Sequence, residues 1–202
     1  MHIVDGVMSL PVLAASTVVA VAGCYMGLRQ LTDSKIPQAA VMSACFFVAS
    51  LVHIPVGPSS VHLIFNGLIG LLLGWSAFPI ILIGLILQAV FFGFGGLIVL
   101  GVNAVNIALP AVIIGLALKP YMHRWSPAIV GFISGFGAVF LTSLFVALSL
   151  TLSGDVFFNS ASLVIVAHTP VALVEGFICA YLFRLLFKIR PDLVVPRSKL
   201  EV

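Results

Sequence analysis

Charged side chains are scarce in this 202-residue chain. Asp, Glu, Lys and Arg together make up 7% of it, and hydrophobic residues make up 62%, whereas a soluble domain carries about 25% charged residues. So little charge excludes a protein whose whole surface faces water, and we expect an integral membrane protein. The apolar runs also lack the alternation of apolar and polar residues that membrane strands need. The sequence therefore predicts an all-α helical bundle.

Several motifs are absent as well. The three cysteines, Cys24, Cys45 and Cys179, are isolated in apolar runs, and no C-x-x-C pair occurs, which argues against a zinc knuckle or a disulfide framework. No basic segment precedes the first apolar run, where a cleavable signal peptide would carry one, so we interpret the N-terminus as mature. No G-x-x-x-x-G-K-[ST] run is present, and we therefore expect any ATP hydrolysis to occur in another polypeptide.

Seven apolar segments follow one another along the chain, with boundaries good to about 2–4 residues. They cover residues 8–29, 37–53, 61–75, 79–98, 104–118, 127–152 and 163–189. A helix needs roughly 20 apolar residues to cross a membrane. The sequence thus predicts a bundle of seven transmembrane helices that forms a single transmembrane domain over residues 1–202.

The basic residues indicate how this bundle is oriented. With seven spans, all nine fall on one side of the membrane: Arg29, Lys35, Lys119, Arg124, Arg184, Lys188, Arg190, Arg197 and Lys199. Because basic loops stay in the cytoplasm, we expect the N-terminus outside and the C-terminus inside. The net charge of +3 then reflects topology, and we expect no nucleic-acid partner.

Four of the five histidines are predicted to lie at the outer side of the membrane or just within it. They are His2, His53, His62 and His168, and only His123 falls on the inner side. Polar groups at membrane depth are costly and usually mark a pathway or a site. A group of histidines open to the outside is typical of metal capture.

The strongest ligand candidates lie at the N-terminus and in the loop before the third segment. The amine of Met1, the backbone nitrogen of His2 and the ring of His2 can chelate one metal ion through fused five- and six-membered rings. The ring of His62 can complete a four-coordinate plane. Nitrogen-rich tetragonal sites suit Ni(II) and Cu(II), and less typically Co(II). No thiolates or Met clusters surround these residues in the sequence, which argues against Cu(I) and zinc–thiolate sites.

Three other polar residues can each be interpreted in two ways. His53 is a ligand or a membrane-interface residue. Ser60, with Ser59 beside it, is part of the site or caps the third helix. Asn103, which follows a glycine-rich stretch able to form a tight turn, supports a ligand through a hydrogen bond or caps the next helix.

Two further pairs of residues share a helix face by their spacing. His168 and Glu175 are seven residues apart, which is two helical turns, and Glu175 is the one acid predicted within a span. This pair is either structural or part of a transport route. Gly23 and Gly27 form a G-x-x-x-G motif that permits close helix approach, more readily within the bundle than to a partner.

Four motifs in order resemble the CbiM/NikM family, the substrate-capture membrane subunits of energy-coupling-factor transporters for cobalt and nickel. They are residues 1–6 (MHIVDG), 54–63, 88–103 and 168–176, and the resemblance covers nearly the whole chain. One departure is Phe94, which stands where many cobalt members carry His. The resemblance leaves nickel and cobalt both open.

This resemblance implies a seven-helix fold with one helix added at the N-terminus. It also implies ligation by the Met1 amine, the His2 backbone and ring and the His62 ring, with Ni²⁺ or Co²⁺ as transported ligand and no prosthetic group. The implied partners are a transmembrane coupling (T) subunit, two cytoplasmic ATPases and often a small accessory membrane protein. The implied location is the prokaryotic cytoplasmic membrane, in contact with its lipids.

Two rival functions remain to be compared with metal capture. The first is an intramembrane metalloenzyme built on His62, His168 and Glu175, although the chain lacks H-E-x-x-H. The second is a stand-alone metal carrier or channel, which predicts polar residues in a line across the membrane, whereas the polar residues here concentrate in the outer half. We therefore expect a transport subunit rather than an enzyme.

Overall fold

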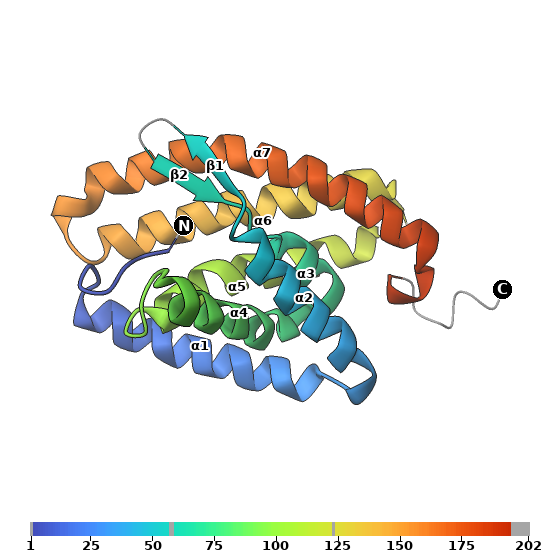
Figure 1. Ribbon diagram of the computed structural model, residues 1–202, viewed down its shortest axis with the longest axis horizontal. Helices are drawn as coiled ribbons and strands as arrows, with labels where there is room; N and C mark the ends of the chain where they lie inside the picture. The colour runs from blue at the N-terminus through green and yellow to red at the C-terminus, as the bar shows by residue number, and fades with distance from the viewer. Residues whose placement is uncertain (1, 57–58, 123, 195–202) are drawn as a thin grey trace.

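Seven α-helices form most of the chain in the computed structural model, which describes residues 2–56, 59–122 and 124–194 (Figure 1). For residues 53–56 and 59–61 it describes the backbone alone. The helices are α1 (Leu10–Gln30), α2 (Ile36–Ala49), α3 (Asn66–Leu73), α4 (Ala77–Phe92), α5 (Leu100–Leu118), α6 (Pro127–Thr151) and α7 (Phe158–Ile189). Short 3-10 turns adjoin them: η1 (Asp33–Lys35), η2 (Gly74–Ser76), η3 (Lys119–Tyr121), η4 (Asp155–Phe157) and η5 (Pro191–Leu193).

A small β-hairpin separates α2 from α3 and lies beside α7 (Figure 1). Its strands, β1 (His53–Val56) and β2 (Ser59–His62), are antiparallel, with His53 opposite His62. The prediction that Ser59 and Ser60 cap the third helix is wrong, because these residues belong to β2 and α3 begins only at Asn66. Residues 59–62 pair with β1, so they cannot extend α3 toward its N-terminus.

Five helical stretches among the described residues are long and apolar enough to cross a membrane. They are Leu10–Gln30, Asn66–Phe92 (α3, η2 and α4 taken together), Leu100–Tyr121, Pro127–Thr151 and Asp155–Ile189. This confirms a multi-pass helical membrane protein. Two predicted spans are shorter than the roughly 20 residues that a membrane helix needs: α2 has 14 residues and α3 has 8. In the third segment the cause is the hairpin, which leaves two turns of helix.

The fourth segment is also shorter than predicted. Helix α4 ends at Phe92 because Gly93 adopts a left-handed conformation with φ 67°, the usual way in which glycine stops a helix. Residues 93–99 then form a loop that leads into α5. This loop lies beside the N-terminal segment of the chain, as described below.

Small residues allow several helix backbones to approach closely, as is common in membrane bundles. A Cβ atom added to Gly135 of α6 would lie 2.6 Å from the carbonyl oxygen of Glu175 in α7. The predicted G-x-x-x-G contact of α1 is intramolecular, because Gly23 faces the ring of Phe78 and Gly27 faces the backbone of Trp75. These contacts seat α1 against the start of α4.

The chain runs back and forth between two ends of the bundle. Ser76 Oγ, just before α4, donates to the carbonyl oxygen of Gly27 near the end of α1 at 3.0 Å. Gly101, at the start of α5, lies instead against Thr17 in the first half of α1. Helix α4 is therefore antiparallel to α1, and α5 starts at the end where α1 starts.

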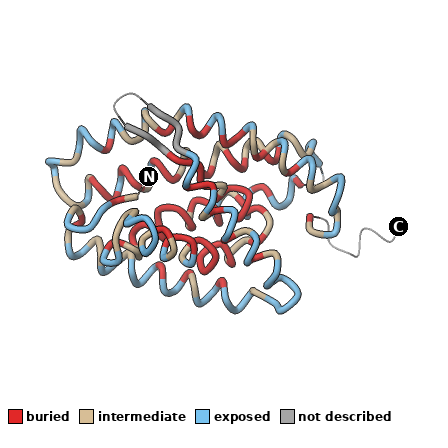
Figure 2. The backbone as a smooth tube through the Cα atoms, in the orientation of Figure 1, coloured by how far each residue is buried: buried red, intermediate tan, exposed pale blue. Residues whose placement is uncertain are grey.

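Buried residues concentrate along the middle of the bundle and exposed residues along its outside (Figure 2). Many of the exposed side chains are large and apolar, among them Val18, Tyr25, Val90, Leu163 and Phe177. Such a surface is unfavourable in water but suited to lipid. The outer face of the helices is therefore the face that contacts the membrane.

Candidate metal centre

The N-terminal segment is held inside one end of the bundle. Ile3 is buried, its backbone nitrogen donates to Asn103 Oδ1, and Asn103 Nδ2 donates back to the Ile3 carbonyl, both at 3.0 Å. The carboxylate of Asp5 accepts from the backbone nitrogen of Val99 at 3.0 Å. Residues 2–5 are therefore held by the α4–α5 loop and the first turn of α5.

This anchoring brings together the two histidines that were predicted as ligands. The ring centroids of His2 and His62 are 4.9 Å apart, and His2 Nδ1 lies 3.2 Å from His62 Nε2. Both histidines come from outside the long helices, His2 from the N-terminal segment and His62 from the end of β2. Sixty residues separate them in the sequence, so the fold alone creates this pair.

Hydrogen bonds on the far side of each ring determine where the ring protons lie. His2 Nε2 bonds Gln88 Oε1 at 2.7 Å, and His62 Nδ1 bonds the Leu63 carbonyl at 3.0 Å. The Leu63 carbonyl can only accept, so His62 carries a proton on Nδ1, and His2 carries one on Nε2 where Gln88 presents its oxygen to that atom. The two remaining nitrogens, His2 Nδ1 and His62 Nε2, face each other across 3.2 Å.

Burial sets the protonation of this site. It lowers the pKa of His2 from its ordinary 6.5 to about 4, because a charged imidazole is poorly solvated there. His62, Gln88 and Asn103 are buried, and the ring of Phe94 stacks over His2 with centroids 6.0 Å apart. At neutral pH the His2 ring is therefore neutral, which is the form that binds metal ions.

The carboxylate of Glu175, in α7, lies beside residues 64 and 65, which follow His62 in the chain. Its carboxylate accepts hydrogen bonds from the backbone nitrogens of Ile64 and Phe65, directly before α3. A carboxylate at a helix N-terminus satisfies amide groups that have no partner in the helix. Glu175 thus fixes the backbone immediately after His62, and its carboxylate is occupied by this role.

His168 lies two turns before Glu175 on the same helix and is also buried. Its Nδ1 bonds the Val164 carbonyl at 2.6 Å, and its Nε2 is a buried atom with no hydrogen-bond partner among the described residues. The structure records no bond between His168 and Glu175.

The remaining predicted residues are placed as follows. Asn103 is not the cap of its helix, because α5 begins at Leu100 with Val99 as its N-cap. The side chains of His53 and Ser60 lie outside the described residues, as does Met1. Among the residues that the structure describes, no group of three or more His, Cys, Asp or Glu could hold a metal ion. Within the described residues, His2 and His62 are therefore a pair and not part of a larger group of candidate ligands.

Sequence reasoning assigned no role to Gln88 or Asp5, which both act at this site. Gln88 is the one amide in an otherwise apolar segment, 79–98, and such a residue at membrane depth is a signal of function. Asp5 gave no comparable signal, because an acid near the N-terminus is ordinarily solvated. Its role depends on the position of Val99, which the sequence does not reveal.

The fold defines a multi-pass helical membrane protein in which His2 and His62 contact each other at one end of the bundle. A family model described as CbiM, cobalt uptake substrate-specific transmembrane region, matches residues 2–193. The chain belongs to this CbiM family of cobalt and nickel transport membrane proteins.

Individual proteins resemble the chain over most of its length. It is 42% identical to a Haemophilus influenzae protein named "Putative metal transport protein", with 96% of this chain and 97% of that protein covered. It is 32% identical to the fused nickel transport protein NikMN of Rhodobacter capsulatus, with 58% of this chain and 36% of that protein covered. A crystal structure of a truncated transition metal transporter shares the fold, with a TM-score of 0.76 at 24% identity over 95% of this chain and 99% of that one.

Proposed function

We propose that this chain is the substrate-capture subunit of an energy-coupling-factor importer for Ni²⁺ or Co²⁺. The observation that carries the proposal is the 3.2 Å separation of His2 Nδ1 and His62 Nε2, with the other nitrogen of each ring bonded to a carbonyl oxygen. At this separation the two nitrogens can share a proton or occupy neighbouring positions around one metal ion. A divalent transition metal ion is the cation that imidazole nitrogens select.

The proposed ligand set is the Met1 amine, the His2 backbone nitrogen, His2 Nδ1 and His62 Nε2. His2 Nδ1 is the ring atom that closes a six-membered chelate with its own backbone nitrogen. Asn103 supports this arrangement by holding the next backbone unit, Ile3. Gln88 and Leu63 act as the outer partners that orient each imidazole, a role that metal-binding histidines generally require.

The orientation proposed for the subunit is seven crossings, with the N-terminus outside and the C-terminus in the cytoplasm. Support comes from the alternation of helix ends and from the cations Lys35, Lys119 and Arg190, which share one cavity. These cations mark the cytoplasmic side. The hairpin and α3 together complete the third crossing, since backbone that is not helical is tolerated in a membrane when protein surrounds it.

The proposed partners are a transmembrane coupling subunit, two cytoplasmic ATPases and a small accessory membrane protein. Two observations support them. The chain has no phosphate-binding motif of its own, and a match over 96% of this chain covers only 36% of a Methanocorpusculum labreanum protein named "Putative fused cobalt transport protein CbiMQ", which leaves room there for a further component. ATP hydrolysis by the partners would then drive release of the metal ion into the cytoplasm.

The rival functions receive less support. A metalloenzyme on His62, His168 and Glu175 conflicts with the occupation of the Glu175 carboxylate by the backbone of residues 64 and 65. A stand-alone carrier or channel needs polar groups that can bind an ion deeper in the bundle. The buried amide nitrogen of Asn66 donates to the Ile107 carbonyl and Thr142, which leaves its Oδ1 as a single possible ligand, and no group of three or more His, Cys, Asp or Glu accompanies it within the described residues.

The decisive experiment is a calorimetric titration of the detergent-purified protein with Ni²⁺ and Co²⁺. A native N-terminus should give one-to-one binding, and a single residue added before Met1 should abolish it by removing the amine ligand. His2→Ala and His62→Ala should behave similarly, whereas His168→Ala should bind normally. Unchanged affinity in the extended protein would show that the N-terminal chelate is wrong. Metal uptake by cells with this chain alone, compared with cells that also contain the partners, separates a capture subunit from a carrier.

A further inference from the structure

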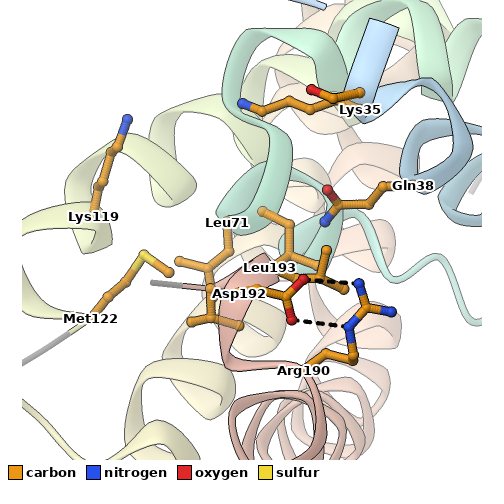
Figure 3. Close-up of a pocket in the computed structure, with 11 residues that line it drawn as sticks. Lys35, Gln38, Leu71, Lys119, Met122, Arg190, Asp192 and Leu193 are labelled. Atoms are coloured by element: carbon orange, nitrogen blue, oxygen red, sulfur yellow. Dashed lines mark hydrogen bonds and ion pairs between the residues drawn. The ribbon is translucent and has the colours of Figure 1, made fainter. Parts of the chain in front are cut away.

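A cavity of about 670 Å³ lies at the end of the molecule opposite the histidine pair. It opens between the start of α2, the end of α3, η3 and η5. Its lining includes Lys35, Gln38, Leu71, Lys119, Met122 and Leu193. Figure 3 shows Lys35, Gln38 and Lys119 arranged around the apolar side chains of Leu71 and Leu193.

The polar groups of this cavity favour an anion. Arg190 is neutralised by Asp192, with Nη2 to Oδ2 at 2.8 Å and Nε to Oδ1 at 2.9 Å, as the dashed lines in Figure 3 mark. Neither Lys35 nor Lys119 forms an ion pair within the described residues, so the two lysines leave an excess of two positive charges. The Nε2 atom of Gln38 is buried with no hydrogen-bond partner there, and it is a donor.

An apolar groove continues from this cavity along the side of the bundle. A second cavity of about 450 Å³ shares Gln38, Leu72 and Arg190 with the first. It extends along Pro37, Val41, Met42 and Leu186, between α2 and α7. Leu186 belongs to the last turn of the candidate membrane span Asp155–Ile189. The groove therefore lies at the membrane-facing side, and the cationic cavity lies at its end.

We propose that the cavity and groove together bind one anionic phospholipid. The phosphate would lie between Lys35 and Lys119 and accept a hydrogen bond from Gln38 Nε2, and an acyl chain would lie along Val41 and Met42. Basic cavities between membrane helices on the cytoplasmic side suit anionic headgroups. A free phosphate would leave the apolar groove empty, and a zwitterionic lipid would leave the excess positive charge unmatched. An acidic protein segment would match the lysines but not the groove.

Native mass spectrometry of the detergent-purified full chain tests this proposal. The probe is an equal mixture of phosphatidylglycerol and phosphatidylcholine with identical acyl chains. We expect the protein to retain one phosphatidylglycerol in preference to phosphatidylcholine. Lys35→Gln with Lys119→Gln should weaken phosphatidylglycerol binding by about fivefold for each lysine removed, as expected for a basic residue near an anionic lipid. Arg124→Gln removes a charge near η3 outside the cavity lining and should bind like the unchanged protein.

The apolar half of the site needs its own variant. Val41 is exposed on α2, so Val41→Trp should fill the groove without disturbing the core and should also weaken phosphatidylglycerol binding. Glycerol 1-phosphate, which has the headgroup but no acyl chain, should not displace the lipid. Equal retention of the two lipids, unchanged binding in the double lysine variant or in Val41→Trp, or full displacement by glycerol 1-phosphate would each overturn the proposal. Ni²⁺ titration of every variant provides a folding control at the other end of the bundle.

Discussion

Asn103 and Ile3 form a reciprocal pair of hydrogen bonds, in which each atom of the Asn103 amide binds the backbone of Ile3 at 3.0 Å. This is the pairing that a neighbouring strand would make, supplied here by one side chain. It fixes the rotation of the chain next to His2 and therefore the direction of the His2 ring. Metal affinity at the proposed site should depend on Asn103 although that residue binds no metal.

The corresponding prediction concerns Asn103→Ala. Without its side chain the N-terminal segment loses its register, and Ni²⁺ affinity should fall by about 10–100-fold, the usual effect of removing a residue that orients a ligand. Calorimetric titration measures this change. Asn106→Ala is the matched control, since Asn106 is buried one turn further along α5 and binds Ser149. It should lose stability and keep its metal affinity.

Gln88 should contribute through its oxygen alone. Gln88→Met keeps the size of the side chain but removes the acceptor for His2 Nε2, so Ni²⁺ affinity should fall by about tenfold or more. Gln88→Glu keeps an acceptor and should retain affinity close to that of the unchanged protein. If the two variants bound Ni²⁺ equally well, the assigned proton on His2 Nε2 would have no part in the site.

The glycines of the α4–α5 loop provide a matched pair of substitutions. Gly93 and Gly95 both have left-handed backbones, with φ 67° and 77°, so alanine at either position should cost about 1 kcal/mol in the free energy of unfolding. A Cβ at Gly93 meets nothing within 4 Å, whereas one at Gly95 would lie 2.9 Å from Asn103 Nδ2 and 3.4 Å from His2 Cβ. Thermal unfolding should show similar losses for both, and metal titration should show a loss for Gly95→Ala alone.

Glu175 should affect stability more than it affects ligand chemistry. In Glu175→Gln one carboxylate oxygen becomes an NH₂ group facing the amides of Ile64 and Phe65, which leaves a buried donor without an acceptor. The free energy of unfolding should fall by about 1–3 kcal/mol. Unfolding in dodecylmaltoside, followed by loss of tryptophan fluorescence, measures this change. A variant as stable as the unchanged protein would exclude the capping role.

Much of the fold follows from the sequence because long apolar runs have one stable form in a membrane. The sixth segment, predicted at 127–152, is α6 at Pro127–Thr151, and the first, predicted at 8–29, is α1 at Leu10–Gln30. The hairpin was missed because residues 53–62 carry Pro, Gly and Ser signals that fit a loop equally well. Their pairing as strands depends on packing beside α7, which lies far away in the sequence.

The candidate site, like the fold, could be predicted from the sequence only in part. His2 stood out because it directly follows Met1 ahead of a long apolar segment, and His62 because it lies just before an expected helix. Their pairing was predicted from the outer-side position of both residues and from the resemblance to a family, whereas the separation of 3.2 Å depends on the fold, since no local pattern joins residues 60 positions apart. Glu175 was predicted to be either structural or part of a transport route, and its bonds to backbone nitrogens fit the structural alternative. The partner of Asp5 could not be predicted, because a backbone nitrogen leaves no trace in residue type.

The bond from Glu175 to the start of α3 also has a consequence for biogenesis. Glu175 follows Ile64 by 111 residues, so the ribosome finishes α3 long before the acid that caps it exists. Eight residues are too few for a helix to be stable alone, and the amides of Ile64 and Phe65 would meet lipid without an acceptor. Helix α3 and residues 62–65 before it should therefore reach their final form only after α7 has entered the membrane. A chain released from the ribosome before residue 175 should be recognised by membrane proteases as unfinished.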